Sequence, residues 1–309
     1  MAGMKIGYPC INRTIGCKGA RTFRLKSYSE ERLIATVENN LNCLLEMLKF
    51  NVRHDILFFR ITSDLVPFAS HPICKFDWQV YFRGKFDEIG DFIKASDIRI
   101  SMHPDQFTLI NSVDEGVFET SVKELLYHAQ VLDTMGLDTT AKIQIHVGGV
   151  YGDKAKSMQR FIERFHRVPD VISRRLVVEN DDRNYTLKEC IEISKETGIP
   201  VLLDAFHHKV NNAGESIRQA FSMFHGTWRK KDGVPMMDFS LQGVDKIRGG
   251  HTETIDMKLF KEFLDQTKPY DFDIMLEIKD KEQSAIKAVE AAKKDRRFVH
   301  FPYNRKPSQ

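Results

Sequence analysis

Short apolar segments alternate with longer amphipathic segments along the whole chain. The run from Val201 to Leu203 follows a Gly-Ile-Pro break and is typical of a strand that is buried on both faces of a parallel sheet. After Ser29, by contrast, apolar residues such as Leu33 and Val37 recur at helical spacing. The pattern therefore predicts strands and helices in alternation.

The alternation predicts a (β/α)8 TIM barrel, because right-handed crossovers close eight such units into a ring. The predicted strands cover residues 5–9, 56–62, 98–102, 142–147, 176–179, 201–204, 236–241 and 274–278. The predicted helices begin near residue 29 and cover about 82–94, 115–135, 154–172, 187–197, 215–224, 256–266 and 281–293. A doubly wound open sheet is the alternative. No linker rich in Pro, Gly or Ser divides the chain, so we expect one domain over residues 1–309, with a core at about 5–295 and a short C-terminal tail.

The composition fits a protein with one large core, since 42% of the 309 residues are hydrophobic. No apolar run approaches the ~20 residues of a membrane span, and the N-terminus lacks the apolar segment of a secretory signal. We therefore expect a cytoplasmic protein that acts as a monomer and makes no membrane contact. The cysteines show no CxxC spacing, so we expect all of them to be reduced. They are Cys10, Cys17, Cys43, Cys74 and Cys190.

Positive charge is concentrated near the N-terminus, although the net charge is only +3. No acidic residue precedes Glu30, while the loop after the first predicted strand, at residues 12–26, carries Arg13, Lys18 and Arg21. A loop of this kind would suit a phosphate backbone. A solvated surface segment is the alternative.

Polar residues of the metal-binding kind end six consecutive predicted strands. The C-terminal strand ends of a barrel open on one face, where the active sites of this fold lie. One such residue commonly marks a polar exit from the sheet, but six in succession predict a metal centre. The residues are His103, His146, Glu179, Asp204 with His207, Asp238 and Glu277, and His251 on a glycine-flexed loop is a further candidate.

This many ligands exceeds the four of a tetrahedral site, which predicts two or three divalent ions that share bridging carboxylates. Such clusters suit displacement at phosphorus, although sugar isomerases also use two metals on this fold. Gln106 and Phe107 follow His103-Pro104-Asp105, and a planar ring beside an amide could enter a duplex in place of a base. For Phe107 and for Tyr8, packing in the core is the alternative.

Several motifs together resemble the UV damage endonuclease family, in the same order from about Lys5 to Glu282. They are Gly7-Tyr8-Pro9-Cys10, Phe68-Ala69-Ser70-His71-Pro72, Ser101-Met102-His103-Pro104, His146-Val147-Gly148-Gly149, Glu179-Asn180-Asp181 and Asp204-Ala205-Phe206-His207-His208. The resemblance implies a barrel like that of endonuclease IV with a trinuclear site. It also implies a DNA nick 5′ to ultraviolet photoproducts, leaving a 3′ hydroxyl and a 5′ phosphate.

The resemblance also implies roles for individual residues. His103 and His146 would bind one ion and Glu179 would bridge, with Asp204 and Glu277 on a second ion and His207 and His251 on a third. Glu179, Glu277, His103 and His251 would be catalytic. Gln106 and Phe107 would probe the lesion, Tyr8 and Asn12 would lie near the flipped bases, and His71, Arg13, Lys18, Arg21 and Lys154 would be further contacts to lesion-containing double-stranded DNA. Mn²⁺ is the expected ion, with Mg²⁺, Co²⁺ or Zn²⁺ as alternatives.

The chain departs from the family pattern on the seventh predicted strand and at Phe107, one of the two residues that would probe the lesion. Met236 and Asp238 stand where that pattern has a lysine, sometimes carboxylated, and a histidine, and Phe107 stands where tyrosine is common. An acidic oxygen in place of an imidazole favours Mn²⁺ or Mg²⁺ over Zn²⁺. Three other functions stay open: an abasic-site endonuclease of the endonuclease IV type, a sugar isomerase like xylose isomerase, and a lesion-binding module without catalysis.

Overall fold

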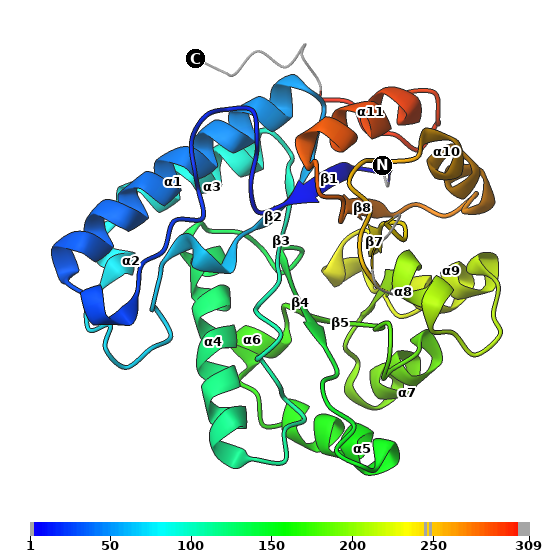
Figure 1. Cartoon of the computed structure of the whole chain (residues 1–309), viewed down its shortest axis with the longest axis horizontal. Coiled ribbons are helices and arrows are strands. Elements are labelled where there is room, and N and C mark those ends of the chain that lie inside the picture. The colour runs from blue at the N-terminus through cyan, green and yellow to red at the C-terminus, as the bar shows by residue number, and fades with distance from the viewer. Residues whose placement is uncertain (1–2, 244–245, 247–248, 302–309) are drawn as a thin grey trace.

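Eight parallel strands close into a barrel in the computed structural model of the chain, which describes residues 3–243, 246 and 249–301 (Figure 1). β1 (Ile6–Pro9) pairs with β2 (Phe58–Ile61) on one side and with β8 (Asp273–Leu276) on the other. The strands between them follow in sequence order: β3 (Arg99–Met102), β4 (Lys142–His146), β5 (Leu176–Glu179), β6 (Val201–Asp204) and β7 (Met236–Phe239). The predicted TIM barrel is confirmed, and the open sheet is excluded because β1 and β8 are paired.

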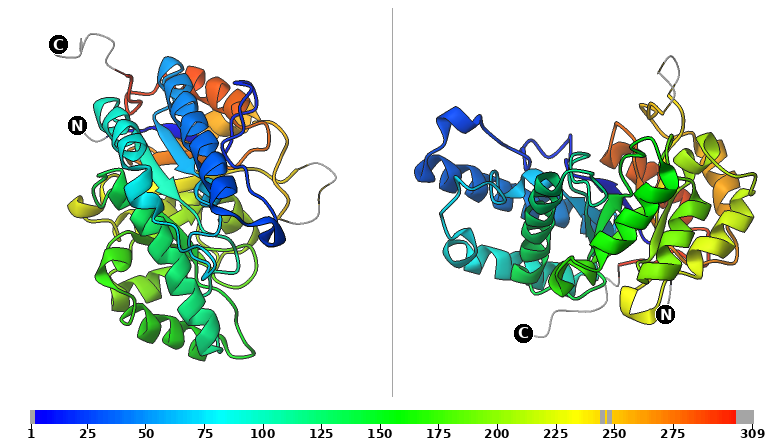
Figure 2. Two further views of the ribbon diagram at one scale, coloured as in Figure 1. Left: turned by 90° about the vertical axis from the view of Figure 1, so that its left-hand side faces the viewer. Right: turned by 90° about the horizontal axis from the view of Figure 1, so that it is seen from below.

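Helices surround the strands on the outside of the barrel (Figures 1 and 2). They are α1 (Glu30–Arg53), α2 (Trp78–Tyr81), α3 (Arg83–Ala95), α4 (Glu115–Thr134), α5 (Lys154–Phe165), α6 (Asp170–Ser173), α7 (Leu187–Thr197), α8 (Ala205–Val210), α9 (Ile217–His225), α10 (Met257–Gln266) and α11 (Glu282–Ala292). α1 begins where the sequence predicts, since the Ser29 side chain accepts a hydrogen bond from the Arg32 amide.

Two helical segments differ from the sequence prediction. The helix expected over residues 154–172 is interrupted, because Pro169 cannot continue a helix and constrains the residue before it. The short helix α8 directly after β6 was missed. It begins because the Asp204 carboxylate accepts a hydrogen bond from the His207 amide at 2.7 Å and so caps the first turn. α8 thereby turns His207 back toward the end of the barrel.

The interior of the barrel contains a small apolar cluster that is separate from the larger core. β2 shows how the inward positions alternate, since Phe58 belongs to this apolar cluster and Arg60, two residues later, is buried among polar side chains. β7 repeats the pattern with Met236 and Asp238. A polar layer therefore covers the apolar cluster at the C-terminal end of the barrel.

The expectation that every cysteine is reduced is wrong. Cys17 and Cys43 form a disulfide, with their Cα atoms 5.8 Å apart. The loop after β1 folds back on α1, where Asn39 donates to the Lys18 carbonyl at 2.8 Å, and this brings the two cysteines together. Their sequence separation of 26 gives no sign of the contact. Cys10, Cys74 and Cys190 are free.

The two ends of the described chain pack together. Met4 forms a parallel bridge with Phe298, which is buried, so packed residues extend past the expected core boundary at 295. Residues 302–309 of the expected C-terminal tail lie outside the described residues. No helix among those described combines the length and the apolar character needed to cross a bilayer.

The packing of α3 against the end of α4 predicts different effects of one substitution at two glycines of α3. A methyl group on Gly90 would lie 1.9 Å from the Met135 carbonyl oxygen, whereas Gly84 has no atom within 4 Å of that position. Gly90→Ala should lower the free energy of unfolding by about 1–3 kcal/mol. Gly84→Ala, the matched control, should leave it unchanged or raise it by up to about 1 kcal/mol. Urea unfolding measures both, and equal effects would contradict the close approach.

Candidate metal centre

The strand ends bring the predicted ligands together around Glu179, which is buried at the end of β5. Its Oε2 atom lies 3.6 Å from Nε2 of His103, after β3, and 3.6 Å from Nε2 of His146, at the end of β4. Its Oε1 atom lies 3.2 Å from Nδ1 of His207 in α8. One carboxylate therefore faces three imidazoles from three different elements.

Two compact groups of ligand atoms share Glu179. The first consists of His103, His146 and Glu179, and the second of Glu179, Asp204 and His207. Within each group the ligand atoms lie within 4.8 Å of one another. A carboxylate with one oxygen toward each group has the geometry of a bridging ligand.

The second group fits a cation because it contains a buried oxygen without a hydrogen-bond donor. Asp204 is fully buried, and its Oδ2 atom has no hydrogen-bond partner, although it lies 3.6 Å from Nδ1 of His207. Burial raises the pKa of Asp204 to about 7. Burial lowers the pKa of His207, but the Asp204 and Glu179 carboxylates outweigh burial and raise it to about 11. A proton on His207 balances part of this negative charge, and a divalent ion bound between the same groups would replace that proton.

Asp238 and Glu277 lie in a third group with Asp204, but both also bind Arg60. Nη2 of Arg60 donates to the two Asp238 oxygens at 2.7 and 2.8 Å. Nη1 donates to one oxygen of Glu277. Burial raises the pKa of Glu277, but the guanidinium outweighs burial and lowers it to about 2. Burial raises the pKa of Asp238 well above its ordinary value.

Sequence reasoning missed Arg60 and Gln144, which connect these carboxylates. Gln144 on β4 donates to Glu179 at 2.5 Å and to Asp238 at 2.7 Å, and its oxygen accepts from Arg60 at 2.7 Å. The available signal was an arginine inside the apolar Phe58–Ile61 strand, where a charged side chain has no place unless it is paired. Gln144 lies within β4 two residues before His146, so it faces the same side of its strand.

His251, on the loop after β7, is the fourth histidine of the cluster. Its Nδ1 atom is 2.9 Å from the Ser240 hydroxyl, and its Nε2 atom is 3.7 Å from Oε2 of Glu277. The Ser240 contact fixes the ring so that Nε2 points at the carboxylate. Burial lowers the pKa of His251, which favours the neutral imidazole that a metal requires.

A cavity of about 610 Å³ opens beside this cluster. Gln106 and Arg13 both contribute to its wall. Phe107 is 73% exposed, so the alternative that it packs in the core is wrong. The predicted site residues that line the cavity are Arg13, His103, Gln106, His146, His251 and Glu277. Arg60 and Lys281, which the sequence analysis did not single out, also line it.

The predicted base contacts Tyr8 and Asn12 need correction, because both side chains are buried. The Tyr8 hydroxyl donates to Asn51 at 2.7 Å and accepts from Asn12 at 2.9 Å. The side-chain oxygen of Asn12 in turn accepts hydrogen bonds from the backbone amides of Thr14 and Ile15. These two residues therefore anchor the start of the basic loop, and for Tyr8 the core alternative is the correct one.

The other predicted DNA contacts lie away from the cavity wall. Lys18 and Arg21 are exposed on the loop that packs on α1. His71 is exposed, and its Nδ1 atom accepts from the Ile73 amide. Lys154 forms an ion pair with Glu189 at 2.8 Å. Their contact with DNA remains a prediction, and it requires a ligand that extends well beyond the cavity.

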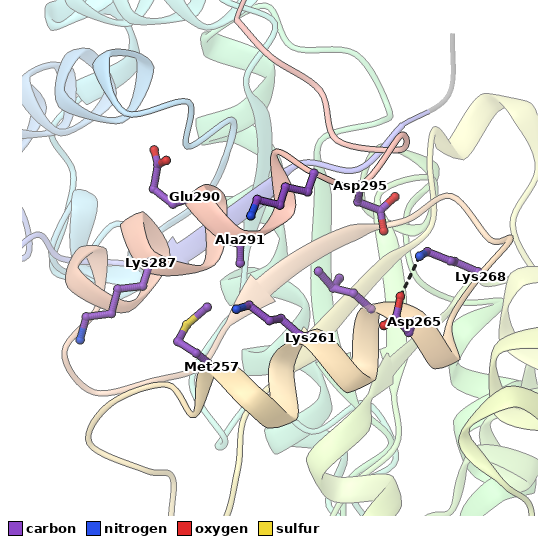
Figure 3. Close-up of a pocket in the computed structure, with 10 residues that line it drawn as sticks. Met257, Lys261, Asp265, Lys268, Lys287, Glu290, Ala291 and Asp295 are labelled. Atoms are coloured by element: carbon purple, nitrogen blue, oxygen red, sulfur yellow. Dashed lines mark hydrogen bonds and ion pairs between the residues drawn. The ribbon is translucent and has the colours of Figure 1, made fainter.

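Another cavity, of about 500 Å³, lies between α10 and α11 (Figure 3). Its wall combines lysines with acidic residues, and Asp265 is paired with Lys268 at 2.7 Å. None of the predicted site residues contributes to its wall. The candidate chemistry therefore belongs to the cavity at the C-terminal strand ends.

Comparison with known proteins shows which family this chain resembles. The model of the family described as "UV-endonuclease UvdE" matches residues 4–299. The UV DNA damage endonuclease of Clostridium perfringens is 38% identical over 292 residues, which cover 94% of this chain and 71% of that protein. Its counterpart in Bacillus thuringiensis subsp. konkukian is 33% identical over 297 residues, which cover 93% of this chain and 94% of that protein.

Several solved structures also match this chain. The crystal structure of SacUVDE matches with a TM-score of 0.91 and 46% identity, and the match covers 94% of this chain and 98% of that chain. Endonuclease IV from Thermus thermophilus matches with a TM-score of 0.56 and 14% identity, over 81% of this chain and 93% of that chain. A D-tagatose 3-epimerase-like protein also matches at 0.56 and 14%, over 94% of this chain and 96% of that chain. The last two matches show a shared fold alone.

Two adjacent histidines in α8 give a matched test of the metal centre. His207 faces Glu179, whereas Nε2 of the buried His208 lies 3.1 Å from the Glu215 carbonyl, away from the cluster. His207→Asn should weaken Mn²⁺ binding by at least about tenfold, since even residues that only support metal ligands have effects of that size. His208→Asn should leave the affinity within about twofold. Calorimetric titration of the metal-free protein with Mn²⁺ measures both, and equal losses would remove His207 from the ligand set.

Proposed function

The chain belongs to the UV-endonuclease UvdE family, and from that premise we propose that it is a metal-dependent DNA repair endonuclease. In this proposal it cuts the backbone 5′ to cyclobutane pyrimidine dimers and 6-4 photoproducts and leaves a 3′ hydroxyl and a 5′ phosphate. The observation that carries the proposal is a cluster of imidazoles and buried carboxylates beside an open cavity whose wall includes Arg13 and Gln106. Such a protein would act on DNA in the cytoplasm.

Two or three divalent ions, most suitably Mn²⁺, would be held by the two groups that share Glu179 and by the Glu277–His251 pair. When bound, such ions supply hydroxide at neutral pH and neutralise charge on the phosphoryl oxygens and the leaving alkoxide. The mixture of imidazole and carboxylate donors suits Mn²⁺, and Mg²⁺, Co²⁺ and Zn²⁺ are the alternatives.

The chain's own residues would position the backbone at the cavity. His103, His251 and Glu277 line its wall, so a phosphodiester seated there would lie directly beside candidate ligands. Arg13 contributes a positive charge to the same wall, and its backbone amide donates to Glu282 at 3.0 Å, which fixes this part of the loop. A positioned guanidinium orients a phosphate without reading sequence.

Gln106 and Phe107 would recognise the damaged step. Phe107 exposes 73% of its surface on the loop after β3, where burial in a duplex would remove apolar area from water. An aromatic ring that replaces an extruded base restores stacking, and the Gln106 amide beside it would occupy the gap. Extrusion costs least where a lesion has already weakened pairing, so damage would favour its own recognition.

A defined-duplex assay tests the proposed substrate. With Mn²⁺, the protein should nick a duplex 5′ to a thymine dimer and leave the undamaged duplex intact, and EDTA should abolish the nick. Glu179→Gln should lower cleavage by at least about a thousandfold, because it removes the carboxylate that both ligand groups share, while DNA binding stays within a few fold. Cleavage at an abasic analogue alone would favour the endonuclease IV type. Absence of a salt-dependent gel shift would favour a sugar isomerase, and binding without any nick by the unaltered protein would favour a recruitment module.

Truncation of Gln106 or Phe107 should affect discrimination between damaged and undamaged duplex more than the overall affinity for DNA. Phe107→Ala should reduce the preference for damaged over undamaged duplex by about tenfold, because stacking on one aromatic ring is worth about 1–3 kcal/mol. Gln106→Ala should also reduce this preference, because its amide would no longer occupy the gap left by the extruded base. Gln159→Ala, at an exposed position in α5, is the control and should change neither quantity. Competition binding with the two duplexes gives the ratio. An unchanged ratio in both probe variants would contradict this role.

A further inference from the structure

Arg60 lies inside the barrel beneath the candidate metal centre, with 3% of its surface exposed. We infer that Arg60 is a built-in cation of the site: its guanidinium takes both oxygens of Asp238 and one oxygen of Glu277, so Asp238 positions the site and binds no metal ion. This inference rests on the proposed metal-dependent function and reassigns one of the ligands predicted from sequence.

The first argument is the hydrogen bonding of the two buried aspartates. Both oxygens of Asp238 accept from Nη2 of Arg60, and its Oδ2 atom also accepts from Gln144 at 2.7 Å. Asp204 is equally buried, yet its Oδ2 atom accepts no hydrogen bond and has only the Nδ1 atom of His207 at 3.6 Å. A cation can therefore reach Asp204 in the present arrangement, whereas at Asp238 it would first have to displace the guanidinium.

The second argument is charge. A guanidinium keeps its proton throughout the accessible pH range, so Arg60 is a permanent positive charge in contact with Asp238 and Glu277. A divalent ion placed between the same two carboxylates would face that charge at close range in a medium of low dielectric constant, where repulsion is strong. The group formed by Asp204, Asp238 and Glu277 is thus already neutralised in part from within the protein.

The third argument is that Arg60 holds ligands that remain available. Glu277 gives one oxygen to Arg60 and keeps Oε2, which lies 3.7 Å from His251. Through Gln144, whose oxygen accepts from Arg60 at 2.7 Å and whose amide donates to Glu179 at 2.5 Å, the same guanidinium orients the bridging carboxylate. Arg60 is therefore a positioning residue, and residues that orient ligands in this way commonly affect metal affinity.

Metal content of the whole chain tests the inference. Each variant is equilibrated by dialysis against Mn²⁺, and bound ions per chain are counted by elemental analysis. Asp204→Asn should lose one ion relative to the unaltered protein, and Asp238→Asn should lose none. Arg60→Met should gain one ion, because Asp238 and Glu277 then lack a cation, and Arg60→Lys should keep the original count. Arg99→Met removes another buried barrel arginine, one that contacts Asp273 instead, and should leave the count unchanged.

Loss of an ion in Asp238→Asn would overturn the inference, as would an unchanged count in a folded Arg60→Met variant. Circular dichroism establishes the fold of each variant, and if Arg60→Met does not fold, the comparison of Asp238→Asn with Asp204→Asn decides alone. A separate result, in which the unaltered protein retains no Mn²⁺, would contradict the proposed metal-dependent function and not the pairing of Arg60 with Asp238.

Discussion

Three buried carboxylates and a partly buried fourth at one end of the barrel impose the constraint on which this site depends. Glu179, Asp204 and Asp238 are almost fully buried, and Glu277 is close beside them. An uncompensated buried carboxylate costs several kcal/mol, so the fold requires positive charge at this place. Arg60 supplies part of it permanently. Divalent ions would supply the rest, and the same charge would serve hydrolysis of a phosphodiester.

The barrel makes this concentration of charge possible because neighbouring parallel strands are paired in a fixed register. Register pairs His146 with Glu179 and Asp204 with Asp238 across neighbouring strands, so these side chains leave the sheet side by side. An apolar layer formed in part by Phe58 seals the barrel directly beneath them. The strands thus fix the candidate ligands. The loop after β1 places Arg13 in the cavity wall, and the loop after β3 exposes Phe107 to solvent.

Sequence reasoning reached the fold and most of the candidate site for one physical reason. In a parallel barrel the C-terminal ends of all strands meet on one face, so His103 and Glu277 could be placed together without coordinates. The same rule cannot find Arg60 or Gln144, which lie within strands and whose partners depend on which way each side chain points. It also misplaced Tyr8, because a strand end near the site can still turn its side chain into the core, here toward Asn51. The disulfide of Cys17 was missed because it depends on how a loop folds back.

The most direct test of the central claim is anomalous scattering at the manganese edge from crystals of the protein equilibrated with Mn²⁺. The account predicts separate peaks on either side of the Glu179 carboxylate, one within coordination distance of His103 and His146 and the other within coordination distance of Asp204 and His207. Absence of any peak at Glu179, or manganese bound only elsewhere on the molecule, would contradict it.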